Sequence, residues 1–173
     1  TVFWNDRPLS LPDCTTDFKF SHQLASPEDV QQIYFGPGSH IAPHDHMVYW
    51  ATSALKTENV TANPSHGIQV SEKIQLYAPA DIYRIDARRE TRSIDEGSTY
   101  VEWGAYLTTC DGHQLMFGHV AEPSDEILAA LEKTEPECDV PTSASGQIGC
   151  VWLIETFIPA GTPIFKSSGF AVD

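Results

Sequence analysis

Short runs of hydrophobic and β-branched residues recur along the chain, and turn residues separate them. This pattern is typical of strands. The predicted strands cover residues 30–35, 47–51, 68–77, 82–85, 100–107, 113–119 and 150–158. Residues 124–133 instead have the spacing of an amphipathic helix, with Ser124 as a suitable N-cap and Ile127, Leu128 and Leu131 on one side. We therefore expect an all-β domain, a single β-sandwich or barrel, with one short helix.

Asp111-Gly112 provides the clearest turn signal. The pair lies between the predicted strands 100–107 and 113–119. An Asp-Gly pair between β-rich runs favours a hairpin, because glycine adopts positive φ without strain. We expect these two strands to pair.

The chain has 173 residues, which suits one domain with its own core. No internal repeat or long linker divides it. Residues 1–29 are rich in proline and polar residues, and we expect an extended N-terminal arm there. The β domain is expected to occupy residues 30–173.

Acidic residues outnumber basic ones: 24 Asp and Glu stand against 10 Lys and Arg, and the formal net charge is −14. A nucleic-acid-binding protein takes much of its affinity from basic residues, so this balance excludes that class. No hydrophobic run approaches the roughly 18 residues that suggest a membrane-spanning helix, so we expect no membrane span.

The four cysteines, Cys14, Cys110, Cys138 and Cys150, contain no Cys-x-x-Cys pair. Three disulfide connectivities are possible, and four buried thiols are the alternative. We favour Cys138–Cys150, which closes a loop rich in polar residues, together with Cys14–Cys110. Asn59-Val60-Thr61 is an N-glycosylation acceptor. These features favour a secreted or extracytoplasmic protein whose signal peptide has been removed.

Three of the seven histidines lie close together, at His40, His44 and His46, with Asp45 between the last two. Imidazole and carboxylate groups are good ligands for zinc and similar ions. Alternate residues share one face of a strand, so His44 and His46 point together there, whereas a turn at Pro43 brings His40 towards Asp45. Both arrangements stay open.

His119, at the end of a predicted hairpin strand, is the second candidate for chemistry. His113 lies six residues earlier. For His113, His22 and His66 we expect ordinary structural roles, because clustering and perturbation are what mark functional sites.

One resemblance is to the cupin pattern, in which a glycine is followed after five residues by His-x-His. Gly38 and His44-Asp45-His46 fit that spacing. Residues 48–51 contain no glutamate where that family places a metal ligand. The resemblance implies a small metal enzyme that holds iron or manganese with His44 and His46.

A broader resemblance is to the lysostaphin/LytM-type zinc metallopeptidases, also called the duplicated hybrid motif. Four pieces follow the order of that family's motifs. They are His40 with Asp45, an Ala-Pro turn in residues 76–83, a hairpin end in residues 116–120, and a glycine-containing turn in residues 158–169. This resemblance implies a fold of that type and a zinc-dependent hydrolysis of peptides, with a cell-wall or peptidoglycan-like substrate.

The resemblance also implies roles for individual residues. His40 and Asp45 would hold zinc with a third ligand near Asp173, and His46 is the alternative to Asp45. His119 would orient or deprotonate the attacking water. The family's final His-x-His motif is missing here. Asp173 replaces that ligand, or the motif lies beyond residue 173, or the chain is a relative without peptidase activity.

Whether the chain is an enzyme thus stays open. The alternative function is a non-enzymatic extracellular binding or assembly module on the same β scaffold. The aromatic residues of the arm and the further Trp and Tyr residues favour it, and self-association is then expected.

Overall fold

The computed structural model describes residues 11–14, 19–36, 46–51, 69–70, 73–95, 98–141, 148–167 and 170–171. Its strands are β1 (Val30–Gly36), β2 (His46–Ala51), β3 (Gln69–Val70), β4 (Gln75–Tyr77), β5 (Ile82–Asp95), β6 (Ser98–Thr108), β7 (Gln114–Pro123), β8 (Glu137–Pro141), β9 (Ile148–Ile158), β10 (Pro163–Ser167) and β11 (Phe170–Ala171). The helix α1 covers Asp125–Leu131, and a 3-10 helix covers Pro27–Asp29. The prediction of an all-β fold with one short helix is confirmed.

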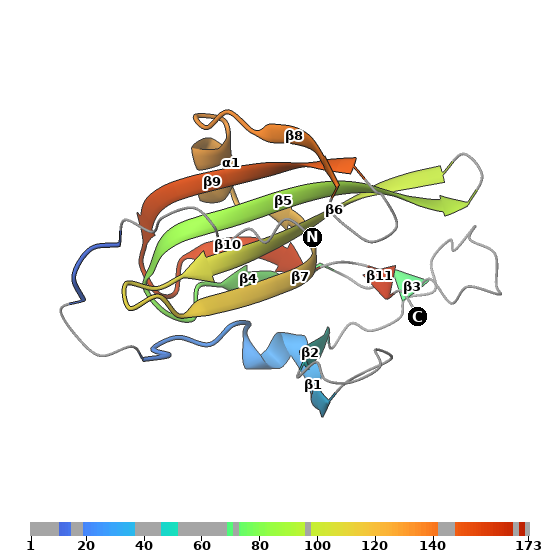
Figure 1. The fold of residues 1–173 in the computed structure, drawn as a ribbon. Coiled ribbons are helices and arrows are strands. Elements are labelled where there is room, and N and C mark those ends of the chain that lie inside the picture. Colours follow the sequence, from blue (N-terminus) through green and yellow to red (C-terminus); the bar gives the residue numbers. More distant parts are fainter. Residues whose placement is uncertain are drawn as a thin grey trace.

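Seven of these strands form one antiparallel sheet in the order β4-β10-β7-β6-β5-β9-β8 (Figure 1). The pairs β1–β2 and β3–β11 make two further small sheets. The predicted hairpin is present as β6 and β7, and Gly112 in its turn has a φ of 85°. Glycine adopts such a φ without strain. The hairpin that the Asp-Gly pair predicted is therefore confirmed.

The contacts of α1 show that the large sheet is rolled. The helix contacts β7, β9 and β10. β9 and β10 are each second from opposite edges of the sheet. A seven-residue helix is only about 10 Å long, so it reaches both strands only where the sheet curves towards itself. Each of the six strand pairs of this sheet contains a register shift, and such irregularities bend the strands.

Ser124 starts α1 and also anchors it to β10. Its hydroxyl accepts the backbone N–H of Ile127 and donates to the carbonyl of Pro163 at 2.8 Å. Its own N–H donates to the carbonyl of Ile164 at 2.8 Å. Ile127 and Leu131 face the core, whereas Leu128 of the predicted stripe is exposed. The N-cap therefore fixes both where the helix begins and where it lies.

The hydrophobic core lies between the inner face of the rolled sheet and α1. Residues that face each other across β9, β5 and β6 form its centre. Ile154, Ile85 and Leu107 face one another across the three strands. Two residues further along β5, Ala87 faces Ala105 of β6, and both also belong to the core. Further members of this core are Ile74, Leu76, Ala78, Ile82, Val120, Ile127, Leu131, Ile158, Ile164 and Phe165.

Several strand boundaries differ from the sequence prediction. β5 continues to Asp95, ten residues beyond the predicted end at residue 85, and the predicted strand 68–77 is divided into β3 and β4. β8 and β10 were not predicted. No helix in the described ranges is long and apolar enough to cross a membrane.

Candidate functional site

Most of the predicted metal ligands lie outside the described residues. This is so for His40, Asp45 and Asp173, and also for the predicted glycosylation site Asn59. His46 is the first residue of β2, and its backbone pairs with the last residue of β1. The metal and glycosylation assignments therefore stay predictions.

His119 lies in β7, which pairs with β6 on one side and with β10 on the other. Only the backbone of His119 is among the described parts, so its catalytic role stays a prediction. His44, the further ligand of the cupin alternative, lies outside the described residues.

Both disulfides are present in the favoured pairing. Cys14 is bonded to Cys110, 96 residues later, and Cys138 is bonded to Cys150. The second bond joins residues that face each other in the β8–β9 register. The pairing prediction is confirmed, and all four cysteines are accounted for.

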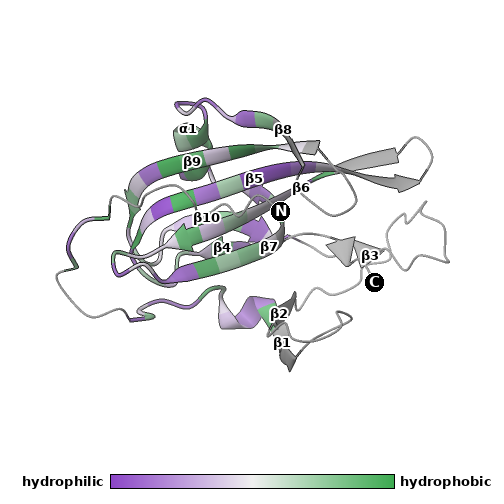
Figure 2. Ribbon diagram, in the orientation of Figure 1, coloured by the Kyte–Doolittle hydropathy of each residue, from purple (hydrophilic) through white to green (hydrophobic). Residues whose placement is uncertain are grey.

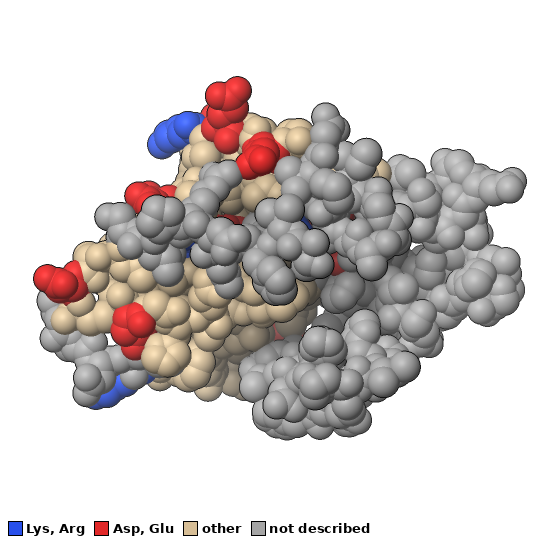
Figure 3. All heavy atoms as spheres, viewed as in Figure 1, with Lys and Arg blue, Asp and Glu red and all other residues tan. Residues whose placement is uncertain are grey.

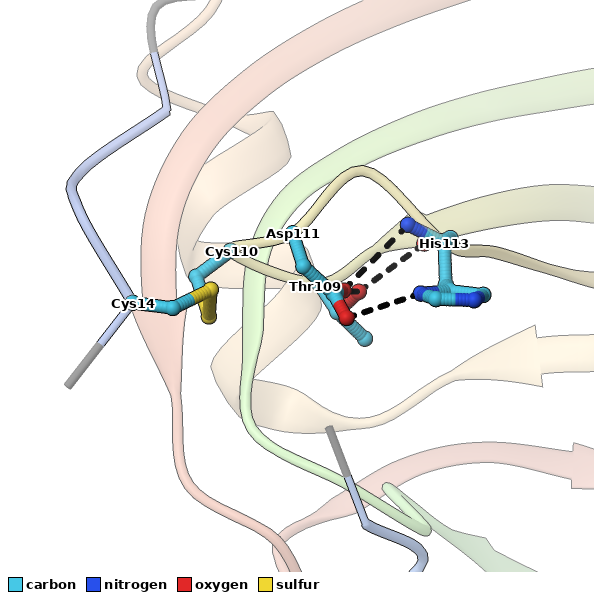
Figure 4. Close-up of a disulfide and its surroundings, with 5 residues drawn as sticks. All are labelled: Cys14, Thr109, Cys110, Asp111 and His113. Atoms are coloured by element: carbon cyan, nitrogen blue, oxygen red, sulfur yellow. Dashed lines mark hydrogen bonds and ion pairs between the residues drawn. A yellow bond between two sulfur atoms is a disulfide. The ribbon is translucent and has the colours of Figure 1, made fainter. Parts of the chain in front are cut away.

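The Cys14–Cys110 bond lies beside a polar turn that joins β6 to β7 (Figure 4). Asp111 accepts a hydrogen bond from the hydroxyl of Thr109, and its other oxygen lies 2.8 Å from Nδ1 of His113. The hydrogen bonds from Thr109 and then from His113 lower the pKa of Asp111 from 3.8 to about 2. His113 and Thr109 thus both bind Asp111 within this turn, and the expectation that His113 has no other role stays a prediction.

Two segments that carry the resemblance to the lysostaphin-type family lie against each other. The backbone N–H of Ala78 donates to the carbonyl of Thr162 at 2.9 Å, and the N–H of Gly161 donates to the carbonyl of Ala78 at 2.7 Å. The carboxylate of Asp81 accepts the N–H of Ala160 at 2.9 Å. The Ala-Pro turn and the glycine-containing turn, distant in sequence, therefore form one paired structure.

The N-terminal arm covers the edge of the sheet beside these turns. The N–H of Tyr77, in the edge strand β4, donates to the carbonyl of Leu24 at 2.8 Å. The N–H groups of Ser21 and His22 donate to the carbonyl of Pro79, and the His22 ring meets Tyr77 edge to face. An open strand edge invites pairing with another chain, and the arm occupies this one.

A row of charged side chains on β5 was not singled out in the sequence. Nε of Arg84 donates a hydrogen bond to Asp86 at 3.0 Å, and Nε of Arg88 lies 3.0 Å from a carboxylate oxygen of Glu90, with which it forms an ion pair. Arg84, Asp86 and Glu90 are each only 2% exposed. These residues alternate with hydrophobic and other positions along β5 (Figure 2), and this alternation is the signal that could have identified the row.

The facing residues of β6 complete this outer face of the sheet. Glu102 faces Glu90 in the register, and Gly104 faces Arg88. A Cβ at Gly104 would lie 3.2 Å from Nε of Arg88, so the guanidinium packs directly over bare backbone. Tyr106, Met116 and neighbouring residues surround a small depression of about 10 Å³ at this place.

A second charged contact lies across β7 and β10. Lys166 donates to Glu122 at 2.7 Å, and Lys73 lies 3.8 Å from the other oxygen. The Lys166 hydrogen bond lowers the pKa of Glu122, and the same contact raises the pKa of Lys166. Both side chains are well exposed, so the contact contributes little to stability. Elsewhere, acidic side chains are dispersed over the described surface seen in Figure 3.

Within the described part of the chain, no group of three or more His, Cys, Asp or Glu side chains is arranged to hold a metal ion. Comparison of the chain with protein-family models, with curated proteins and with solved structures found no match.

Proposed function

We propose that the chain is an extracytoplasmic zinc-peptidase-like domain related to the lysostaphin/LytM type. The carrying observation is the pairing of the turns at Ala78 and Gly161 through two backbone hydrogen bonds. These turns were matched to the family independently, from separate parts of the sequence. Their direct contact supports the view that the ordered motifs belong to one architecture.

Two disulfides support the extracytoplasmic assignment. Such bonds persist in oxidising compartments and are rare in the cytosol. Cys14 and Cys138 are exposed, so both bonds are open to reducing agents in solution. A chain that relies on them suits an oxidising location.

The donor set of His40, Asp45 and His46 suits zinc, because imidazole nitrogen and carboxylate oxygen are its usual protein ligands. Bound zinc supplies a Lewis acid and lowers the pKa of a coordinated water to about 7. His40 would bind together with Asp45 or His46, and Asp173 is the proposed third ligand. The order of the family motifs supports this set.

His119 is proposed to accept a proton from the attacking water and to orient it towards the peptide carbonyl. His119 is next to Val120, whose backbone pairs with Trp103 of β6 and Ser167 of β10, so the neighbouring residue is anchored in the sheet. The net charge of −14 favours approach of a peptide with basic side chains, such as a crosslinking peptide.

Metal analysis of the purified chain tests this proposal. We expect about one zinc per chain, which is lost in His40→Ala and retained in His113→Ala, the matched histidine control. With a basic peptide as substrate, His119→Ala is expected to abolish hydrolysis while zinc stays bound.

Other outcomes would favour the alternatives. Iron or manganese that depends on His44 and His46, but not on Asp45, would indicate the cupin-type site. A chain that binds no metal and whose mass by light scattering rises with concentration would indicate a non-enzymatic assembly module. Either result would contradict the zinc-peptidase proposal.

A further inference from the structure

Beyond the core, the inner face of the sheet carries two tryptophans that do not belong to the proposed zinc site. Trp152 of β9 faces Ala87 of β5, and Trp103 of β6 faces Arg89, the next residue of β5 on the same face. The two rings meet diagonally across β5, with centroids 5.3 Å apart and an interplanar angle of 34°. Ala87 has only a methyl group, which leaves room for the rings above it.

This face changes gradually from core to solvent. Ala87 is fully buried, Trp103 and Trp152 are partly buried against the core, and Arg89 is exposed. One row further out, Thr91 is exposed and faces Val101, which is also exposed. We call the set Arg89, Thr91, Val101, Trp103 and Trp152 the tryptophan shelf.

Arg89 differs from Arg84 and Arg88, the other arginines of β5 whose side chains the structure describes. Arg84 and Arg88 point to the outer face, and each bonds a carboxylate two residues further along. Arg89 has no hydrogen bond or ion pair to a carboxylate within the described ranges, although acidic residues outnumber basic ones in the chain by 24 to 10. An exposed guanidinium beside two indoles is therefore available to a ligand carboxylate, which it can bind through two parallel hydrogen bonds.

The position of the shelf limits what can bind there. β5 is paired on both sides up to Glu90, and β6 is paired on both sides from Trp103 to Thr108, so strand addition directly beside the two indoles is excluded. Recognition must come from side chains: two flat apolar rings, one hydroxyl and one guanidinium. The net charge of −14 disfavours ligands with many negative charges, whereas a single carboxylate is little affected because charges beyond about 8 Å are screened at physiological salt.

We propose that the tryptophan shelf binds a sugar ring that carries one carboxylate, a hexuronic acid. The apolar face of the pyranose ring lies on the indoles of Trp103 and Trp152, and the carboxylate meets Arg89. Thr91 offers its hydroxyl to the ring hydroxyls. This binding site is independent of the proposed zinc chemistry.

Indole NMR signals give a direct test. The chain has four tryptophans, and single Trp→Phe variants assign their N–H signals. The probe is a disaccharide of one neutral hexose and one hexuronic acid, titrated in the presence of a metal chelator. We expect the signals of Trp103 and Trp152 to shift while those of Trp4 and Trp50 stay in place. The methyl ester of the probe, which has no charge, is expected to bind at least about tenfold more weakly.

Variants separate the roles of charge and ring. Arg89→Gln is expected to weaken binding at least about tenfold, and Arg89→Lys to keep part of the affinity. Lys133→Gln and Phe157→Leu, an exposed cation and an exposed aromatic ring away from the shelf, should leave it unchanged. Arg89 is exposed, so its replacement is not expected to affect folding, and unchanged signals elsewhere verify this.

Several results would overturn the proposal. They are equal shifts at all four indoles, an ester that binds as tightly as the acid, or an Arg89→Gln variant with full affinity. A peptide ending in a free aromatic residue, tested in parallel, would also overturn it by binding more tightly than the sugar acid. Because the chelator removes metal, none of these outcomes depends on the zinc proposal.

Discussion

The two faces of β5 are equally buried at the centre of the sheet but are built from different chemistry. On the inner face, Ile85 and Ala87 pack among hydrophobic side chains. On the outer face, Arg84 and Asp86 are just as buried and are joined by an ion pair. Burial therefore does not identify the hydrophobic core by itself. A strand with two buried faces can carry charges on one of them if those charges are matched.

Removing one partner of the buried Arg84–Asp86 pair is the strongest test of this difference between the two faces of β5. Asp86→Leu leaves the Arg84 charge buried without its carboxylate, and we expect the free energy of unfolding to fall by about 3–5 kcal/mol. Urea unfolding monitored by circular dichroism measures the change. The double variant Arg84→Met/Asp86→Leu removes both charges and should lose less than the single variant. If the single and the double variant lose the same free energy of unfolding, the stability of the outer face does not depend on matching these two charges.

The matching change on the inner face is Ile85→Ala. Ile85 is fully buried, so its truncation leaves a cavity among the core side chains. We expect a loss of about 3 kcal/mol in the free energy of unfolding, by the same measurement. Ile85→Val, which removes one methylene, should cost about 1 kcal/mol. A valine variant as unstable as the alanine variant would contradict simple cavity formation.

A smaller change tests how firmly the outer face is packed. In Gly104→Ala the new methyl would lie 3.2 Å from Nε of Arg88, whose position is held by its ion pair with Glu90. We expect a loss of about 1 kcal/mol from this crowding. With Arg88→Ala in the background the crowding is absent, so the added cost of Gly104→Ala should disappear. A cost that persists there would place the strain in the backbone instead.

The smallest effect is expected at an exposed carboxylate, Asp111, in contrast to the buried Asp86. The pKa of Asp111 is lowered to about 2 in the folded chain, so its contribution to stability is present above about pH 4 and is lost as the pH falls towards 2. Asp111→Asn should therefore melt at a slightly lower temperature than the original chain at pH 6. Melting curves at pH 6, 4, 3 and 2 should show that the difference in melting temperature between the two proteins becomes smaller as the pH falls. A difference that stays constant down to pH 2 would contradict this account.

Local signals in the sequence predicted the elements whose structure is decided locally. Ser124 with the spacing of Ile127 and Leu131 predicted α1, and Asp111-Gly112 predicted the β6–β7 hairpin. Both depend on hydrogen bonds or backbone angles within a few residues. The hydrophobic pattern does not predict β8, because its residues adjoin a segment rich in proline, serine and threonine, and only pairing with β9 makes it a strand.

Long-range features were harder to predict, because they depend on strand register. The charged part of β5 does not resemble a hydrophobic strand. Its charges form ion pairs between residues two positions apart, which lie on the same face only when the backbone is extended. The tryptophan shelf brings together Trp103 and Trp152, which are far apart in sequence and meet only through the registers of β5 with β6 and β9. The spacing of residues 40–46 likewise predicts a local cluster of ligands, whereas the participation of His119 depends on the tertiary fold.

The Cys14–Cys110 bond has a practical consequence for any protease that meets this protein. It encloses every residue from 15 to 109 in one covalent ring, which includes β1 to β6. A single cut anywhere in that ring opens the backbone but releases no fragment, and the same holds for a cut between Cys138 and Cys150. The two pieces of a molecule cleaved once in this way stay joined by the disulfide until a reducing agent is added. A single cleavage in these parts of the chain therefore releases no fragment.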